Sequence, residues 1–340
     1  MKKRIALLLS LSLLLISFAS CDNYRLIKKE TTTTTTTEPI KVAYMNGPTG
    51  MGIAKLIHDN GGTEGNEKYK FVKYDDAALA TADLAAGKID LACLPTNTAA
   101  TLYNKTSKVS ALAINCLNSL YIMTKTGVEI NNLADLEGKT IYTIQNGTPA
   151  SILKHLLSES GINATVETSL KDKTIAAPTD LAPLLVTGQI DIALVPEPVA
   201  TAVPLKIASQ GKDYTYNVAI SITDAWSEIS SSPVAMGCVV ANNTFIENNK
   251  DRLNDFLAEY KASINFIADS ANRDIAAQYI VDAGVLDAVP AAKKSLANLG
   301  SAISYIDGAE MKAVLNDFYT AIGVNLIGGK LPDEKFYYEK

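Results

Sequence analysis

Residues 87–99 read GKIDLACLPTNTA, and residues 188–200 read GQIDIALVPEPVA. Six of the thirteen positions are identical, and both copies carry the same order of signals. A glycine suited to closing a helix precedes an apolar run, and a proline then stands where a new helix can begin. The apolar runs, IDLACL and IDIALV, are typical of parallel strands that are buried on both faces. Two such strand–helix units, about a hundred residues apart, predict two similar α/β lobes.

A second pair of segments repeats in the same order. KVAYMNGPTGMGIAKLI (41–57) and TIYTIQNGTPASILKHLL (140–157) each lead from an apolar strand through Asn-Gly into a helical pattern. Two motifs that recur in the same order at nearly the same offset indicate an internal duplication. Because ligands of open α/β sheets bind beyond the carboxyl ends of the strands, two facing lobes predict one cleft lined by two sets of equivalent loops.

The chain begins with the features of a secretory signal. Three basic residues (2–4) precede a twelve-residue apolar run (5–16), which is too short to span a bilayer but suits a signal peptide. Phe18-Ala19-Ser20-Cys21 resembles the cleavage site of bacterial lipoprotein signals, whose cysteine is lipidated and becomes the mature N-terminus. Residues 1–20 are therefore expected to be a lipoprotein signal peptide. An ordinary cleaved signal with an incidental cysteine is the alternative.

Residues 21–39 are rich in threonine, with seven in succession at 31–37. Such a stretch has too few apolar residues to build a core, so it is expected to be a tether. At roughly 3.5 Å per residue it reaches about 65 Å when fully extended. Together with acyl chains on Cys21, it would hold a globular body just above a membrane surface.

The composition of the 340-residue chain narrows the class of function. The formal net charge is −5, and removal of residues 1–20 with their three positive charges leaves about −8. An acidic chain without a basic patch argues against nucleic-acid binding. Beyond Cys21 three cysteines stand in apolar, strand-like stretches: Cys93, Cys116 and Cys238. They are expected in the core as small hydrophobes, and one disulfide among them stays open as a possibility.

Alternating strand and helix patterns fill the rest of the chain. The first lobe is expected over residues 40–122 plus 237–340, and the second over residues 123–236. The chain would cross to the second lobe near Tyr121–Thr126 and return near Val234–Val240, and two such crossings form a hinge. After the return the chain is expected to be mostly helical and to finish on the first lobe. Expected strands lie at 40–45, 69–74, 90–94, 109–115, 120–124, 140–145, 164–168, 191–195, 216–222 and 233–243, and expected helices of the first lobe at 49–60, 77–87 and 96–104.

The order of these features resembles that of bacterial ABC-transporter solute-binding lipoproteins. The signal with its cysteine, the repeated Gly-x-Ile-Asp-x-Ala-x-x-Pro unit, NNLADLEGKTI (131–141) and the helix-rich tail carry the resemblance. The nearest group is the nitrate, sulfonate, taurine and thiamine-precursor binding class. The resemblance implies a two-lobed type II periplasmic-binding-protein fold of the α/β class, each lobe being a mainly parallel sheet flanked by helices. It also implies a small-molecule solute, no catalysis, no cofactor, and an ABC permease with its ATPase subunit as partners.

In this family the solute is held by loops at the strand ends and beside the crossings, which here include 46–51, 95–97, 146–151 and 196–197. Helix starts in the first and third of these loops present unpaired N–H groups and partial positive charge, which can hold an oxyanion without a cationic side chain. Tight turns with capping threonines are the alternative interpretation of both loops. The expected ligand-binding residues are Asn46, Gly47, Thr49, Gly50, Met51, Thr96, Asn97, Asn118, Asn146, Thr148, Ser151, Glu197 and Trp226.

The distribution of arginine limits the charge of the solute. No arginine lies between Arg25 and Arg252, so most of both lobes offers no bidentate clamp for a carboxylate or phosphate. This favours a sulfonate- or nitrate-like oxyanion held by helix ends, or a neutral heteroaromatic solute held by stacking and amide groups. Trp226, the only tryptophan, could wall the cleft or simply pack. Glu197 could accept a hydrogen bond from the solute or simply favour a helix start.

Other functions stay open as alternatives. An enzyme or a single-turnover cofactor-precursor synthase of the same fold would need a catalytic set. The only two histidines, His58 and His155, stand in amphipathic helical patterns, where a surface or boundary position is the default. The sequence shows neither a Ser/His/Asp set nor metal-ligand spacing, so no metal is expected. A sensor or adhesion lipoprotein of the same fold is harder to exclude.

Overall fold

The computed structural model describes residues 38–145 and 147–339. The expected signal peptide (1–20), the expected lipidation site Cys21 and nearly all of the expected tether lie outside the described residues. Residues 38–340 form one compact unit. Within the described part of the chain, no helix is both long enough and apolar enough to cross a membrane.

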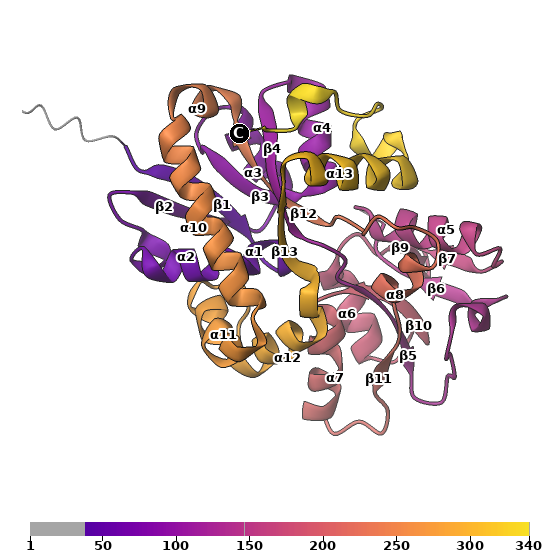
Figure 1. Cartoon of the computed structure of the whole chain (residues 1–340). Coiled ribbons are helices and arrows are strands. Elements are labelled where there is room, and N and C mark those ends of the chain that lie inside the picture. The colour runs from indigo at the N-terminus through magenta and orange to yellow at the C-terminus, as the bar shows by residue number, and fades with distance from the viewer. Residues whose placement is uncertain (1–37, 146, 340) are drawn as a thin grey trace, which may run out of the picture. The chain divides into compact units, whose positions relative to one another are not determined.

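The first lobe is built on a six-stranded sheet (Figure 1). In order across the sheet its strands are β13 (Ile303–Asp307), β4 (Val109–Cys116), β12 (Gly237–Asn242), β3 (Leu91–Pro95), β1 (Ile40–Met45) and β2 (Tyr69–Tyr74). β1 pairs in parallel with β2 and β3, whereas β12 runs antiparallel to both of its neighbours, β3 and β4. β13 runs antiparallel to β4. The strands β1 to β4 therefore share one direction.

The second lobe is built on a five-stranded sheet. In order its strands are β11 (Tyr216–Ser221), β5 (Leu120–Lys125), β10 (Ile192–Pro196), β6 (Thr140–Tyr142) and β7 (Thr165–Glu167). β10, β6 and β7 pair in parallel, and β5 runs antiparallel to both β10 and β11. A short hairpin, β8 (Ser169–Leu170) and β9 (Lys173–Thr174), stands apart from this sheet. Each lobe thus has one strand that runs antiparallel to both of its neighbours: β12 in the first sheet and β5 in the second. Both of these strands lie next to a segment where the chain passes from one sheet to the other.

Helices flank the two sheets (Figure 1). The earlier helices are α1 (Pro48–Met51), α2 (Ala54–Asp59), α3 (Ala77–Ala85), α4 (Thr96–Thr106), α5 (Pro149–Glu159) and α6 (Pro178–Val186). The later helices are α7 (Val199–Ser209), α8 (Ile222–Ser227), α9 (Asn243–Asn248), α10 (Lys250–Ala268), α11 (Arg273–Asp282), α12 (Val289–Leu299) and α13 (Gly308–Ile322). Short 3₁₀ turns lie at Gly62–Glu64, Leu133–Leu136, Ser270–Asn272, Gly300–Ala302, Val324–Ile327 and Glu334–Phe336.

The two copies of the repeated unit fold alike. Gly87 follows α3 and Gly188 follows α6, and both adopt φ of 70°, a left-handed conformation that closes a helix at little cost for glycine. The apolar runs become β3 and β10, whose first four residues are buried in each case. β3 then pairs in parallel with β1, and β10 with β6. The predicted two-lobed α/β fold is confirmed.

The chain passes between the two sheets twice. The first crossing occupies residues 117–119, between β4 and β5, and the second occupies residues 233–236, before β12. The segment expected to hold the first crossing, 121–126, instead lies mostly in β5, because Leu120 already pairs with Pro196 of β10. The second sheet begins with Leu120 of β5, a few residues before the expected boundary of the second lobe at residue 123.

The C-terminal part of the chain is mostly helical, as expected, but it also contains β13, which the sequence pattern does not predict. β13 forms the edge of the first sheet and is only half-buried over most of its length, so it lacks the continuous apolar run of a central strand. The tail also contacts the second lobe, since α12 packs on α7 and α13 packs on α5.

One hydrophobic core runs through both lobes. It includes Ala92 and Phe318 of the first lobe together with Ile122 and Ile152 of the second. Two further clusters lie in the first lobe and in the second lobe separately. A core shared across the crossings couples the packing of the two lobes.

The three cysteines of the described chain, Cys93, Cys116 and Cys238, are buried and free. The prediction that they belong to the core is confirmed, and the possibility of a disulfide among them is not realised.

Candidate functional site

The loops that follow β1 and β10 meet between the lobes. A Cβ built on Gly47, in the first lobe, would lie 3.9 Å from Cδ of Pro198, in the second. Gly47 itself adopts φ of 81°, which glycine tolerates. Beside it, Asn46 is exposed and its Nδ2 donates to Oδ1 of Asp75 at 3.2 Å. One strand-end loop of each lobe therefore lies beside the other.

Gly50 closes the turn after β1. Its N–H donates to the carbonyl of Gly47 at 3.0 Å, and a Cβ at Gly50 would lie only 1.8 Å from the carbonyl oxygen of Met45. The expected helix over 49–60 is split into the single turn α1 and the helix α2, with the break at Gly52 and Ile53. Met51 is fully buried in the first-lobe core, so its side chain packs rather than lining a cleft.

Thr96 anchors the second crossing. It is 1% exposed, its Oγ1 donates to the carbonyl of Ala235 at 2.6 Å, and its N–H donates to the carbonyl of Met236 at 3.1 Å. The hydroxyl of Tyr319 donates to its carbonyl at 2.9 Å. Its polar groups therefore position the crossing, while Asn97, the next residue of α4, is half-buried.

Thr148 reaches the same crossing from the second lobe. It is 5% exposed, and its Oγ1 lies 3.8 Å from Sδ of Met236. Its side chain makes no capping bond to α5, which differs from the capping role considered for it. Ser151 is half-buried in the first turn of α5, and Gly147 is exposed. Asn146 lies outside the described residues.

Glu197 is buried between α7 of the second lobe and α12 of the tail, with 2% of its surface exposed. Its Oε1 accepts from Nδ2 of Asn298 at 2.6 Å and from Oγ1 of Thr201 at 3.0 Å, and its Oε2 accepts from Oγ of Ser295 at 3.3 Å. Burial raises the pKa of the Glu197 carboxyl, and the bonds from these three side chains offset part of that rise. The ion pairs of the described residues do not include it. Glu197 thus ties the second lobe to the tail.

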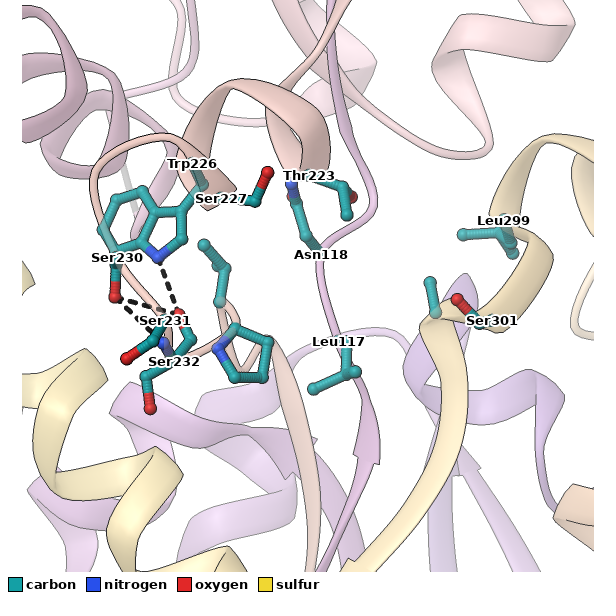
Figure 2. A pocket seen from close by; sticks show the side chains of 13 residues that line it. Leu117, Asn118, Thr223, Trp226, Ser227, Ser230, Ser231, Ser232, Leu299 and Ser301 are labelled. Atoms are coloured by element: carbon teal, nitrogen blue, oxygen red, sulfur yellow. Dashed lines mark hydrogen bonds between the residues drawn. The ribbon is translucent and has the colours of Figure 1, made fainter. Parts of the chain in front are cut away.

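A cavity of about 180 Å³ lies at the crossings, and we call it the hinge pocket (Figure 2). It brings together two of the expected site residues, Asn118 and Trp226. Residues of both crossings, of α8 and the loop after it, and of the turn that enters β13 line it. The lining residues are Leu117, Asn118, Thr223, Trp226, Ser227, Ser230, Ser231, Ser232, Pro233, Val234, Leu299, Ser301 and Ala302.

Hydrogen bonds fix one wall of the hinge pocket. The indole Nε1 of Trp226 donates to the carbonyl of Ser232 at 3.0 Å, and Oγ of Ser230 donates to the same carbonyl at 3.1 Å, as Figure 2 shows. Oγ of Ser230 also accepts from the N–H of Ser232 at 3.1 Å. The ring of His155 lies 5.2 Å from the indole. Trp226 is 3% exposed, so its ring has little freedom to turn.

Asn118 lines the hinge pocket, and its side chain is almost wholly enclosed. The residue is 4% exposed, and its Oδ1 accepts from the N–H of Leu120 at 2.9 Å. Its Nδ2 has no hydrogen-bond partner among the described residues. A buried donor left unsatisfied costs about 1–3 kcal/mol, and Nδ2 is too enclosed for a molecule in the cavity to reach it as the structure stands.

Of the residues that line the hinge pocket, only Asn118 and Trp226 were predicted from the sequence to belong to the site. The three serines at 230–232 stand directly before the second crossing, and such a polar run could have been recognised as a loop beside the hinge. Residues 299–302 carry no comparable local signal, because their place in the hinge pocket depends on how the tail packs.

Reactive groups are scarce in the described part of the chain, where no cluster of His, Cys, Asp and Glu could hold a metal ion. Burial raises the pKa of the Cys93 thiol to about 11 and that of Cys116 to about 12, so both stay protonated at neutral pH. His58 is exposed and stacks on Tyr279 with ring centres 3.8 Å apart, in agreement with the surface position expected for it.

Solved structures share this fold. An ABC transporter protein from Parabacteroides distasonis is 20% identical over 89% of this chain and 100% of its own, with a TM-score of 0.72. The periplasmic aliphatic sulphonate binding protein of Escherichia coli is 15% identical over 89% of this chain and 92% of its own, with a TM-score of 0.68. The periplasmic nitrate-binding protein of Synechocystis PCC 6803 is 14% identical over 83% and 80%, with a TM-score of 0.58. At these identities the similarity is one of fold.

A search of curated proteins found no match. A family model described as NMT1/THI5 like matches residues 68–272, which is more than half of the chain and spans parts of both lobes. The match confirms the resemblance drawn from the repeated unit and the helix-rich tail. The chain therefore belongs to the NMT1/THI5-like family.

Proposed function

We propose that this protein is the extracytoplasmic solute-binding subunit of an ABC importer. It captures a small solute between its two lobes and delivers it to a membrane permease driven by an ATPase subunit. Lipid on Cys21 attaches it to the membrane, and residues 21–39 act as the tether. No covalent bond of the solute is made or broken.

The convergence of loops from both lobes at the crossings carries this proposal. Gly47 faces Pro198 across the lobes, and Thr96 and Thr148, from opposite lobes, both contact the second crossing. A solute that bridges these loops would touch both lobes and the segment that links them. The sulphonate- and nitrate-binding proteins that share the fold are periplasmic binding proteins, which supports the same role here.

Binding would act by shifting the population toward one arrangement of the lobes. A solute can do this only through contacts that are better in that arrangement than in the others. Micromolar affinity corresponds to about −8 kcal/mol, which a modest number of hydrogen bonds and one buried face can provide. The tail contacts the second lobe where α12 packs on α7, beside the bonds of Glu197 to Ser295 and Asn298, and where α13 packs on α5, so movement of the lobes would alter these contacts.

Thermal-shift measurements on residues 38–340, which form one compact unit, test the proposal. One panel holds nitrate, taurine and alkanesulfonates, and the other holds pyrimidines, thiamine precursors, flavins and small aromatics. A solute at a hundred times its dissociation constant should stabilise the folded state by about 2.7 kcal/mol, a clear rise in melting temperature. No rise with any member of either panel would contradict the proposal.

The double variant Asn46→Ala with Thr148→Ala should bind its solute at least tenfold more weakly, or about 1.4 kcal/mol, because one polar side chain is lost from each of two facing loops. Calorimetric titration measures the change, and an unaltered melting temperature shows that the fold is intact. Asn217→Ala, at an exposed position of β11, is the control and should bind normally. Unchanged affinity in the double variant would show that the solute binds elsewhere.

A further inference from the structure

The tail helix α12 meets the second lobe through polar groups. Nδ2 of Asn298 donates to Oε1 of Glu197 at 2.6 Å and to Oγ1 of Thr201 at 3.0 Å. The carbonyl of Asn298 accepts from the hydroxyl of Tyr121 at 2.7 Å. Ser295, one turn earlier in α12 and fully buried, donates to Oε2 of Glu197 at 3.3 Å. We call these residues the latch: Tyr121, Glu197, Thr201, Ser295 and Asn298.

The other face of α12 belongs to the first lobe. Ala292, Leu296 and Leu299 lie in the first-lobe core, and α12 packs on α11, which in turn packs on α2. The bonds of the latch therefore join one lobe to the other. Glu197 directly precedes Pro198, where the strand-end loops of the two lobes meet. The latch thus fixes a loop that the proposed solute-binding function uses, and this inference rests on that function.

Another contact between the tail and the second lobe has a different chemistry. There α13 packs on α5, and both helices contribute apolar side chains to the core that the lobes share, among them Ile152 and Leu156 of α5 and Leu315 and Phe318 of α13. Parting that contact would expose apolar surface, which costs free energy in proportion to the area. The groups of the latch can exchange their bonds for bonds to water at a small net cost. The lobes can therefore separate more easily at the latch.

The carboxyl of Glu197 favours separation when it is ionised. Within the described chain its hydrogen-bond donors are the neutral side chains of Thr201, Ser295 and Asn298. Burial raises the pKa of this carboxyl, so the intact latch favours the protonated form, whereas in water the pKa returns toward its usual value of 4.5. The protonated carboxyl therefore stabilises the intact latch at low pH, and this contribution is lost as pH rises through the raised pKa.

The charged groups around Glu197 do not neutralise it. The ion pairs of the described residues leave it out, although α7 and α12 carry lysines: Lys206, Lys293 and Lys294. Lys293 pairs with Asp274 at 2.9 Å, and the other two lysines are exposed. β10 and residues 46–52 contain no titratable side chain. Tyr121 of β5 stays neutral over the range in which Glu197 changes charge, because burial raises the pKa of its hydroxyl.

We propose that Asn298 is the positioning residue of a latch between the lobes, which holds the second-lobe strand-end loop through Glu197 and parts when the cleft opens. Opening separates α7 from α12, while α5 stays against α13. Asn298 acts on the solute through the loop that it holds, because a loop that is fixed in its binding arrangement binds more tightly than one that is only partly populated there.

Distances between pairs of nitroxide labels, measured by pulsed electron paramagnetic resonance, test the proposal. The full chain carries Cys21→Ser, which removes the cysteine outside the described residues. One pair, Ala208→Cys on α7 with Gln278→Cys on α11, spans the latch. The other pair, Lys154→Cys on α5 with Ala313→Cys on α13, spans the apolar contact. All four labelled positions are exposed, and the remaining cysteines are buried, so they should not take up label in the folded chain.

Asn298→Asp places a second carboxylate against Glu197. At pH 7 the distance across the latch should lengthen, and near pH 4 it should shorten again, because two carboxyl groups side by side can then share a proton. The distance between α5 and α13 should stay the same. Asn298→Ala adds no charge and should give a smaller shift in the same direction, which covers the case in which the aspartate variant does not fold. Asn217→Asp, at an exposed position of β11, is the control and should change neither distance.

An exchange of the two side chains separates positioning from packing. In the double variant Glu197→Gln with Asn298→Asp, the amide and the carboxylate change places, so one can again donate to the other. The short distance across the latch should therefore return at pH 7. Unchanged distances in both single variants of Asn298 would overturn the proposal. A lengthening that the exchange does not reverse, or one that occurs between α5 and α13 instead, would also overturn it.

The label distances need no solute, so the latch and the proposed function can fail separately. A lengthening in Asn298→Asp that the exchange reverses, with no stabilising solute in either thermal-shift panel, would support the latch and contradict the solute-binding role. A panel solute that stabilises the chain, together with distances that Asn298→Asp leaves unchanged, would keep the solute-binding role and overturn the latch.

Discussion

Glu197 makes the stability of this protein sensitive to pH, because its carboxyl is buried without a cation. Burial raises the pKa of the carboxyl above its usual value of 4.5. Such a group favours the folded state while it is protonated: its contribution is complete below the pKa of the unfolded chain and is lost as pH rises through the higher pKa of the folded state. The loss therefore begins near pH 4.5 and continues upward.

Glu197→Gln should remove this dependence. Glutamine is neutral and keeps an acceptor for Asn298, so the variant should be more stable than the unaltered chain at pH 8, by roughly 1 kcal/mol, and nearly equal to it at pH 4. Melting temperatures of both proteins across this range measure the effect. Curves that run parallel over the whole range would show that Glu197 does not change its protonation on folding.

Single residues also mark the limit of reasoning from sequence. Glu197 and Thr96 were expected to meet the solute because they follow the two strand-ending prolines. In the structure, Glu197 is engaged by the tail helix α12 and Thr96 by the second crossing. Both partners lie about a hundred residues or more along the chain, so no local pattern reveals them.

Among the elements, the turn α1 after β1 tolerates little change at Gly50. A Cβ at Gly50 would come within 1.8 Å of the carbonyl oxygen of Met45, which is backbone and cannot move aside alone. The turn sets the path of the loop that brings Gly47 to Pro198, so its geometry controls one side of the meeting of the lobes.

Gly50→Ala should cost at least about 2 kcal/mol of stability, because the backbone must open to admit the methyl group. Gly62→Ala is the comparison. No atom lies within 4 Å of a Cβ there, and only its positive φ of 74° opposes the change, at about 1 kcal/mol. Urea unfolding of both variants measures the difference. Equal losses would mean that the turn adjusts freely.

Elements whose character is set by neighbours in sequence were predicted to within a few residues. β1 and β2 have the expected bounds, and α3 and α4 begin where expected, since apolar runs, glycines and prolines are local signals. The break within 49–60 and the strand β13 were not predicted. The break falls at Gly52 and Ile53, where a Cβ on Gly52 would lie 2.8 Å from Cγ1 of Ile264, and β13 depends on pairing with β4. Both are contacts that the local pattern does not contain.

For the whole molecule, the proposed anchor predicts where the protein is found. Cys21→Ser removes the thiol that would carry the lipid, so the variant should leave the membrane fraction and appear in the soluble extracytoplasmic fraction. The folded body should be unaffected, because residues 38–340 form a compact unit. Fractionation followed by detection of the protein measures this. Retention of the variant in the membrane fraction would contradict anchoring through Cys21.

The arrangement of two lobes could be predicted, whereas the hinge pocket could not. The repeated unit predicts two lobes because each copy contains its own strand and helix. The pocket gathers residues 117–118, 223–234 and 299–302, and their proximity exists only when both crossings and the tail are in place. Asn118 and Trp226 were named from their positions beside the crossings, while their shared cavity is a property of the assembled chain.

The first sheet has a consequence for the order of biosynthesis. All strands of the second sheet lie within residues 120–221, whereas β4, whose eight residues are all buried, must await β12 and β13. The last residues also return to β4, where the N–H of Tyr338 donates to the carbonyl of Ala111 at 2.9 Å. A ribosome or an export channel releases the chain from its N-terminus onward, so the sheet of the second lobe can form while the first sheet still lacks β12 and β13. Until β12 and β13 have been released, the apolar side chains of β4 lack their partners in the folded sheet. We expect the nascent chain to be prone to aggregation during this period.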